Sequence, residues 1–244
     1  MEPRKLIASG RDGDIFELGP ELVLRRTRAG RSLEAEAHVM QYVHQHGYPV
    51  PVVHELRAGG TEIVMDRIDG PIMMDAMLKR LWALPTAAAT LADLHDRLHA
   101  IAAPDWMRQL RDGGNQIVHL DLHPLNVILN PKRGPVVIDW ANASRGDGLF
   151  DVAATYVLLT CPRVPGPAWL RAAAWPIRTA FVRSFARRYR GRELDARIAD
   201  AADFKALDDA MQPDEIAAMQ RLASRMRKRA EKRMIRSREN RERA

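Results

Sequence analysis

The sequence has almost no cysteine and no long apolar run, and both absences narrow the class of protein. Cys161 is the only cysteine among 244 residues, so the chain cannot form an internal disulfide, which is typical of a reducing compartment. No stretch approaches the roughly 20 consecutive apolar residues that a membrane-spanning helix needs, and the first residues do not resemble a signal peptide. We therefore expect a cytoplasmic protein without a membrane span.

Most of the chain also lacks an excess of either positive or negative charge, although the formal net charge of the whole chain is +7. Residues 221–244 hold eleven Lys or Arg and three Glu, a net charge of +8, and the remaining residues have a net charge of −1. The basic character therefore belongs to the C-terminal segment and says nothing about the substrate of the body. Apolar residues make up 46% and charged residues 28%, which is ordinary for one globular domain or two small lobes.

Turn residues and apolar periodicity divide the chain into a β-rich first third and a mainly helical remainder. Short apolar runs predict strands at residues 6–16 (two strands around a turn), 22–25 and 62–65. Ser32 is a suitable N-cap for a helix that ends near His46, and leucines at helical spacing predict another helix over residues 86–101. Beyond Pro167 the pattern is helical to the end of the chain.

The most informative segment combines a short hairpin with three polar residues. Apolar runs at residues 127–129 and 136–138 are separated by Asn-Pro-Lys-Arg-Gly-Pro, which predicts an antiparallel hairpin with a tight turn. Asn126 precedes the first strand and Asp139 follows the second, so both lie at the open end of the hairpin. An amide oxygen beside a carboxylate suits a hard cation such as Mg²⁺. Asp121 can face the same site without being a ligand, an arrangement that phosphoryl transfer uses.

The motif around these residues resembles that of a known family. His119-x-Asp121-x-x-x-x-Asn126, followed by Ile-Asp139-Trp, is similar to the catalytic loop and metal-binding segment of the aminoglycoside phosphotransferase and choline kinase family, which has a protein-kinase-like fold. The resemblance implies that Asp121 is the catalytic base and that Asn126 and Asp139 bind Mg²⁺. It also implies that Asp151, which ends a Gly-Asp-x-x-x-Asp stretch, is structural and braces the loop.

The resemblance implies a phosphate-binding pair in the first third of the chain. Arg25 stands where the family often has Lys, and it offers the phosphates a rigid fork of donors. Glu36 falls within the apolar arc of its predicted helix, where a lone charge is costly, so we expect an Arg25–Glu36 pair. Two alternatives stay open: Arg26 faces inward if the strand register is shifted by one residue, or Glu36 lies in water at the edge of the helix.

Two weaker motifs complete the expected nucleotide site. Residues 9–14, with Gly10 and Gly13, are the candidate for the glycine-bearing loop over the phosphates, although many ordinary hairpin turns look the same. Residues 62–70 resemble the hinge between the lobes, in which Met65 borders the adenine and the backbone of Asp66 and Ile68 binds its edge. The resemblance covers roughly residues 6–160.

These expectations define a bilobal α+β protein-kinase-like fold. A small β-rich N-terminal lobe with one helix spans residues 1–68, a larger and mainly α-helical C-terminal lobe spans 69–226, and a basic tail spans 227–244. ATP and Mg²⁺ are the expected cofactors. The expected reaction moves the γ-phosphoryl group of ATP to a hydroxyl of a small molecule, either aminoglycoside-like or another alcohol.

Two rival functions remain open at the level of sequence. His95 and His99, four residues apart on a predicted helix, are spaced to share a zinc ion, which would suit a zinc hydrolase. The chain could instead be a non-catalytic nucleotide-binding protein whose basic tail binds nucleic acid or an anionic surface. The acidic residues between 195 and 215 could form the carboxylate-rich pocket that a polycationic aminoglycoside needs, but the basic segment after them weakens that interpretation.

Overall fold

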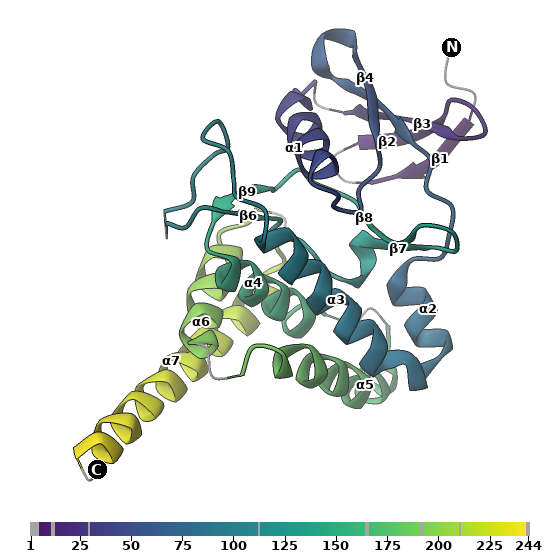
Figure 1. The fold of residues 1–244 in the computed structure, drawn as a ribbon. Coiled ribbons are helices and arrows are strands. Elements are labelled where there is room, and N and C mark those ends of the chain that lie inside the picture. The colour runs from purple at the N-terminus through teal and green to yellow at the C-terminus, as the bar shows by residue number, and fades with distance from the viewer. Residues whose placement is uncertain are drawn as a thin grey trace.

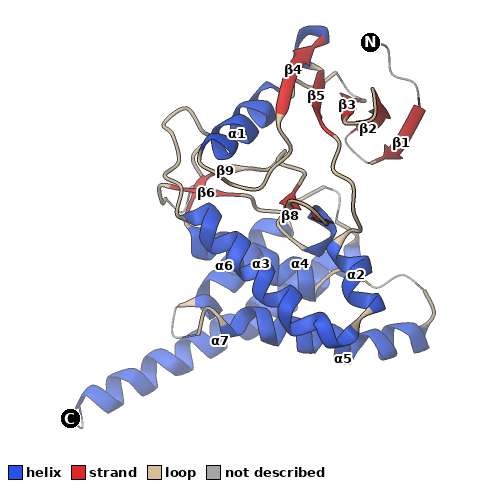
Figure 2. Ribbon diagram, turned by 45° about the vertical axis from the view of Figure 1, so that its right-hand side comes forward, coloured by secondary structure: helices blue, strands red, loops and turns tan. Residues whose placement is uncertain are grey.

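The computed structural model describes residues 5–10, 13–28, 30–111, 113–163, 166–190, 193–209 and 211–242, with side chains as far as residue 235. An antiparallel sheet and one helix form the N-terminal lobe, and a larger bundle of helices forms the C-terminal lobe (Figures 1 and 2). The expected bilobal α+β architecture is confirmed.

The N-terminal sheet has the strand order β1-β2-β3-β5-β4, with every neighbouring pair antiparallel. Its elements are β1 (Lys5–Ser9), β2 (Gly13–Glu17), β3 (Leu22–Thr27), α1 (Glu34–Gln45), β4 (Val53–Arg57) and β5 (Glu62–Asp66). The N-cap of α1 is Leu33, so the prediction of Ser32 was wrong by one residue; the Ser32 hydroxyl instead accepts a hydrogen bond from the backbone N–H of Glu34. Strand β4 has no counterpart in the sequence prediction.

The C-terminal lobe contains the helices α2 (Met73–Lys79), α3 (Leu84–His99), α4 (Gly148–Thr160), α5 (Ala168–Arg187), α6 (Leu194–Lys205) and α7 (Pro213–Glu242). Two small sheets lie between α3 and α4 in the chain: β6 (Gln116–Val118) pairs with β9 (Ser144–Gly146), and β7 (Val127–Asn130) pairs with β8 (Gly134–Val137). The β7–β8 pair is the hairpin that the sequence predicts. Within the described residues, no helix is long and apolar enough to cross a membrane.

One apolar core joins the two lobes, because buried residues of α1 belong to the same cluster as those of the C-terminal helices. Val43 of α1 and Leu91 of α3 are completely buried in it. A second contact crosses between the lobes at Asp66, whose carboxylate accepts from His54 of β4 at 2.7 Å and from Arg133 of the β7–β8 turn at 2.7 Å. The two lobes are therefore held together by apolar packing and by polar contacts.

Helix α7 is continuous across the predicted boundary at residue 227. Its first half is packed, with Met219 and Met226 buried, and its last turns extend away from the body in Figure 1. Arg227 pairs with Asp203, and Arg233 Nη1 lies 3.1 Å from Asp195 Oδ2 on α6. The first turns of the predicted tail therefore contact α6.

Candidate active site

The loop between β6 and β7 carries Asp121 and is held in an unusual backbone conformation. Leu120, just before Asp121, has φ +65°, and Asp139, after β8, has the same value. A non-glycine residue in this left-handed region costs about 1–3 kcal/mol, and such strain persists only where surrounding contacts enforce it. Both strained residues flank the candidate site.

Asp151, at the start of α4, enforces the loop conformation. Its fully buried carboxylate accepts hydrogen bonds from the backbone N–H of His119 at 3.0 Å and of Leu120 at 2.6 Å. Burial alone would raise the pKa of Asp151, but the contacts with His95 and His99 outweigh it and hold that pKa well below its usual range. The charged carboxylate therefore braces the loop, as the resemblance implied.

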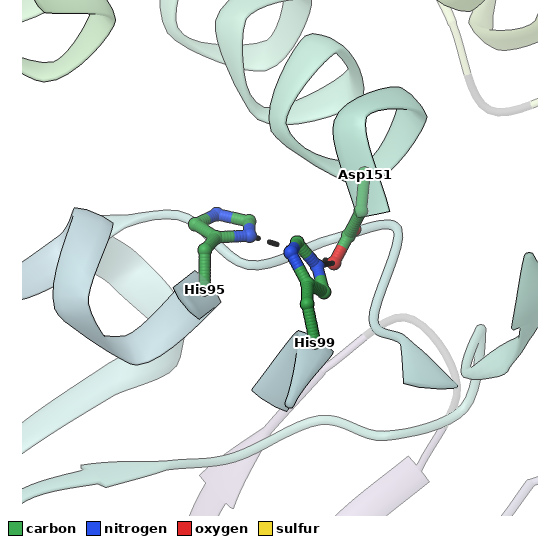
Figure 3. A group of neighbouring side chains, drawn as sticks. All are labelled: His95, His99 and Asp151. Carbon is green, nitrogen blue, oxygen red and sulfur yellow. Dashed lines mark hydrogen bonds and ion pairs between the residues drawn. The ribbon is translucent and has the colours of Figure 1, made fainter. Parts of the chain in front are cut away.

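The two histidines of the zinc hypothesis face this same carboxylate. His99 Nε2 lies 2.9 Å from Asp151 Oδ2, and His95 Nδ1 lies 3.5 Å from the same atom (Figure 3). The three ligand atoms are close enough to hold a metal ion. However, the carboxylate is already bonded to two backbone N–H groups, and His95 Nε2 lies 3.1 Å from the Thr155 hydroxyl. His95 Nδ1 has no hydrogen-bond partner among the described residues, but the other contacts of the cluster hold the loop and favour a structural brace.

Asp121 and Asn126 are joined by the side-chain amide of the asparagine. Asn126 Nδ2 donates to the Asp121 carbonyl at 2.9 Å and to Asp121 Oδ2 at 3.1 Å. This orientation leaves the amide oxygen of Asn126 for another partner. The backbone N–H of Ile138 donates to the Asn126 carbonyl at 3.0 Å, which brings Asn126 beside the residue that precedes Asp139. An amide oxygen and a half-exposed carboxylate at one end of a hairpin fit Mg²⁺, which prefers oxygen ligands.

Arg25 connects this hairpin end to the N-terminal lobe. It donates a hydrogen bond from Nη1 to Glu36 Oε1, and its Nη2 lies 3.7 Å from Asp139 Oδ1. The expected Arg25–Glu36 pair is confirmed, and Glu36 is only 6% exposed. Arg26 faces outward and pairs with Glu62, so the shifted register is wrong. A guanidinium between two carboxylates from different lobes is placed to receive the phosphates of a nucleotide.

Burial dominates the ionisation of Glu36. Desolvation, together with the nearby Asp139 carboxylate, raises its pKa to about 6, although the positive charge of Arg25 acts in the opposite direction. The pair is thus hydrogen-bonded but electrostatically costly, and protonation of Glu36 just below neutral pH would weaken its hold on Arg25.

The candidate phosphate loop connects β1 and β2. Ser9 pairs with Asp14, and the N–H of Gly10 donates to the carbonyl of Gly13 at 2.9 Å; Arg11 and Asp12 lie outside the described residues. A side chain at Gly13 would come within 2.4 Å of the Arg26 carbonyl on β3. Glycine is therefore needed at residue 13 for the close approach of two strands, whether or not the turn covers phosphates.

The candidate hinge, residues 62–70, consists of β5 and the segment after it. Met65 is half-buried at the end of this strand, and the N–H of Asp66 donates to the Val52 carbonyl at 3.0 Å. The N–H of Asp66 is therefore occupied, which leaves its carbonyl as the group that could meet an adenine. Within the described part of the chain, the N–H of Ile68 donates to no backbone carbonyl.

The structure adds one residue that the sequence reasoning missed. Lys205, at the end of α6, has a side chain that is 6% exposed, and its Nζ lies 3.6 Å from Asp121 Oδ1. On the opposite oxygen, His123 Nε2 lies 3.8 Å from Asp121 Oδ2. The spacing of residues along α6 could have indicated that Lys205 is buried, because Lys205 falls on the same face of the helix as Leu194 and Ile198.

Acidic residues near α6 do not form a free carboxylate cluster. Asp195 pairs with Arg233, Asp203 with Arg227, and Asp214 lies 3.5 Å from Arg163. A separate groove between α5, α6 and α7 is lined by eight arginines and by no residue of the catalytic loop. Three of the seven acidic residues between 195 and 215 are thus paired with the chain's own arginines.

A model of the phosphotransferase enzyme family matches residues 4–112 and 71–180. No curated protein matches the sequence. Among solved structures, a thermostable mutant of aminoglycoside phosphotransferase APH(4)-Ia in a ternary complex with ADP and hygromycin B superposes with a TM-score of 0.62 at 18% identity, covering 91% of this chain and 92% of that chain.

Two further structures have the same fold. The gentamicin complex of APH(2")-IIa has a TM-score of 0.61 at 15% identity, covering 91% of this chain and 89% of its own. A choline/ethanolamine kinase family protein from Mesorhizobium loti has a TM-score of 0.57 at 14% identity, covering 93% of this chain and 87% of its own. Identities this low establish the fold and leave the acceptor open.

Proposed function

The chain belongs to the phosphotransferase enzyme family, and on that premise we propose that it transfers the γ-phosphoryl group of ATP to a hydroxyl of a small molecule. The observation that carries the proposal is the position of Arg25, which pairs with Glu36 of the N-terminal lobe and lies 3.7 Å from Asp139 of the C-terminal lobe. A nucleotide whose phosphates enter between the lobes would meet a guanidinium and the expected metal ligands together.

The residues have separate tasks in this proposal. Asn126 and Asp139 hold Mg²⁺, which neutralises charge on the phosphates, and Arg25 contacts the phosphates from the other lobe. Asp121 accepts or orients the proton of the acceptor hydroxyl. Catalysis by such a site is mostly positioning and electrostatic stabilisation.

The weaker assignments belong to the same proposal. The backbone of the Gly10–Gly13 turn covers the phosphates. At the hinge, Met65 borders the adenine, the Asp66 carbonyl accepts from its edge and the Ile68 N–H donates to it. Cytoplasmic location and a nucleic acid partner for the basic segment remain predictions from the sequence, and the comparisons lend no support to a nucleic acid partner.

Thermal-shift measurements with ATP, with and without Mg²⁺, test the nucleotide site. We expect Asp139→Asn to lose most of the Mg²⁺-dependent stabilisation by ATP and to keep the melting temperature of the free protein. Asp93→Asn is the matched control, because Asp93 is an exposed carboxylate on α3 that pairs only with Arg188 among the described residues. An unchanged Mg²⁺ response in Asp139→Asn would remove Asp139 from the metal site.

An ATP-consumption screen over hydroxyl compounds then tests phosphoryl transfer itself. Aminoglycosides, amino alcohols and sugar alcohols cover the classes that the fold allows. Consumption that depends on one compound, and that disappears in Asp121→Asn, is the expected result. Mg·ATP binding without any acceptor-dependent consumption would favour the non-catalytic nucleotide-binding alternative.

A further inference from the structure

Lys205 is a buried cation beside the proposed catalytic carboxylate. Its side chain is 6% exposed, and its Nζ lies 3.6 Å from Asp121 Oδ1, which is an ionic contact longer than a hydrogen bond. Within the described residues, the ammonium donates no hydrogen bond to any protein group. The ammonium therefore has donors left for a ligand.

The two oxygens of Asp121 face different surroundings. Oδ2 accepts from Asn126 Nδ2, the nitrogen end of the amide of a proposed Mg²⁺ ligand, and is therefore occupied. Oδ1 lies nearer Lys205, which comes from α6 of the helical lobe. Among the described residues no group donates a hydrogen bond to Oδ1, so an acceptor hydroxyl that donates to this oxygen would lie beside Lys205.

The charge balance around Lys205 does not suit a polycation. Two carboxylates of α6 are engaged elsewhere: Asp203 pairs with Arg227, and Asp195 at the other end of the helix pairs with Arg233. A cationic group of an acceptor placed here would be repelled by Lys205 at close range.

We propose that Lys205 binds an anionic group, a carboxylate or a phosphate, on the acceptor and thereby selects anionic hydroxyl compounds over aminoglycosides. This inference rests on the proposed function, because Asp121 defines the acceptor side only if it acts on the hydroxyl. The anion accepts the hydrogen bonds that Lys205 leaves unused.

Ligand-observed NMR on the full chain tests the inference with small hydroxyl compounds of different charge. Two matched series serve as probes: glycerate, glycerol 3-phosphate, glycerol and 3-aminopropane-1,2-diol, and glucuronate, glucose 6-phosphate, glucose and glucosamine. Within each series the members share a skeleton and differ in charge, and the carboxylate and phosphate members distinguish the two anions. Each series is measured with and without Mg·AMP-PNP.

We expect one anionic member to bind the wild-type chain at least tenfold more tightly than its neutral and ammonium partners. Lys205→Met should remove that preference, and Lys205→Arg should keep it. Lys79→Met, which neutralises an exposed lysine at the end of α2, is the matched control. Melting temperatures of all variants separate a loss of binding from a loss of folding.

The inference is overturned if the anionic members bind wild type no better than the neutral ones, including the case in which none binds, or if Lys205→Met keeps the preference. Mg·AMP-PNP stabilisation is a separate readout. Stabilisation without charge preference defeats the Lys205 inference alone. Charge preference that depends on Lys205, without any stabilisation by Mg·AMP-PNP, defeats the proposed phosphoryl transfer and leaves an anion site.

Discussion

Glu36 on α1 and Lys205 on α6 place a charge on the apolar face of a helix, one in each lobe. Glu36 is hydrogen-bonded to Arg25, whereas Lys205 lies 3.6 Å from Asp121 and is not hydrogen-bonded to it. Both side chains are almost fully buried. The N-terminal pair is therefore completed within the protein, and our proposal is that a ligand completes the C-terminal pair.

The largest effect should come from Asp121, the partner of Lys205. We expect Asp121→Asn to lower kcat about 10²–10⁴-fold, since a positioned base typically contributes that much, and to change ATP affinity less than threefold. Steady-state kinetics with the acceptor found in the screen measure both quantities. Asp105→Asn is the control, because Asp105 is an exposed carboxylate paired with Arg145 in the same lobe.

A loss of less than tenfold in Asp121→Asn would remove Asp121 from the chemistry. The meaning of the Lys205–Asp121 contact would then change as well, because Lys205 would no longer lie beside the reacting hydroxyl.

The Arg25–Glu36 pair should act on ATP binding as one unit. Arg25→Ala and Glu36→Ala should each weaken ATP binding about tenfold or more. The double variant should bind ATP only slightly less tightly than the single variant with the larger loss, which corresponds to a coupling energy of about 1–3 kcal/mol. Calorimetric titration with Mg·ATP at neutral pH measures the cycle. Additive losses would show that the pair seen in the structure does not act on the nucleotide as one group.

Protonation gives a finer test of the same pair in the nucleotide-free protein. Because burial raises the pKa of Glu36 to about 6 from a usual value of 4.5, the folded chain binds an extra proton between these pH values. The free energy of unfolding of wild type should therefore rise, relative to Glu36→Gln, as pH falls from 7 to 4.5. The expected gain is about 2 kcal/mol.

Urea unfolding of both proteins at each pH measures this difference. Glu34→Gln, a change at an exposed position on the first turn of α1, should track wild type. Parallel pH dependence in wild type and Glu36→Gln would mean that Glu36 ionises normally, and that the pair carries no cost of burial.

The smallest effect should come from the basic segment, which neither charged pair involves. Truncation after Ile235 keeps the contact between Arg233 and Asp195, so melting temperature and ATP turnover should stay within error of wild type. Salt-sensitive retention on heparin should fall, because such binding depends on released counterions. A truncated protein that folds but loses turnover would connect the segment to the active site.

The sequence by itself determined which functional side chains are brought together by a single local element. A tight turn between two apolar runs fixes Asn126 and Asp139 at one end of a hairpin, since strand pairing leaves no other place for them. The apolar arc of α1 required a partner for Glu36, because a buried lone charge is too costly. Both arguments are local, and the structure contains the hairpin and the Arg25–Glu36 pair.

Only the tertiary structure decided which distant groups meet. His95 and His99 have the spacing of zinc ligands, and the position of Asp151, more than fifty residues later, makes them part of a hydrogen-bonded brace. Lys205 follows Asp121 by 84 residues, and no local pattern connects a lysine at the end of one helix to a particular loop. Packing of α6 against α4 brings them within 3.6 Å. Such contacts arise from the global packing of the core, which periodicity and turn chemistry do not encode.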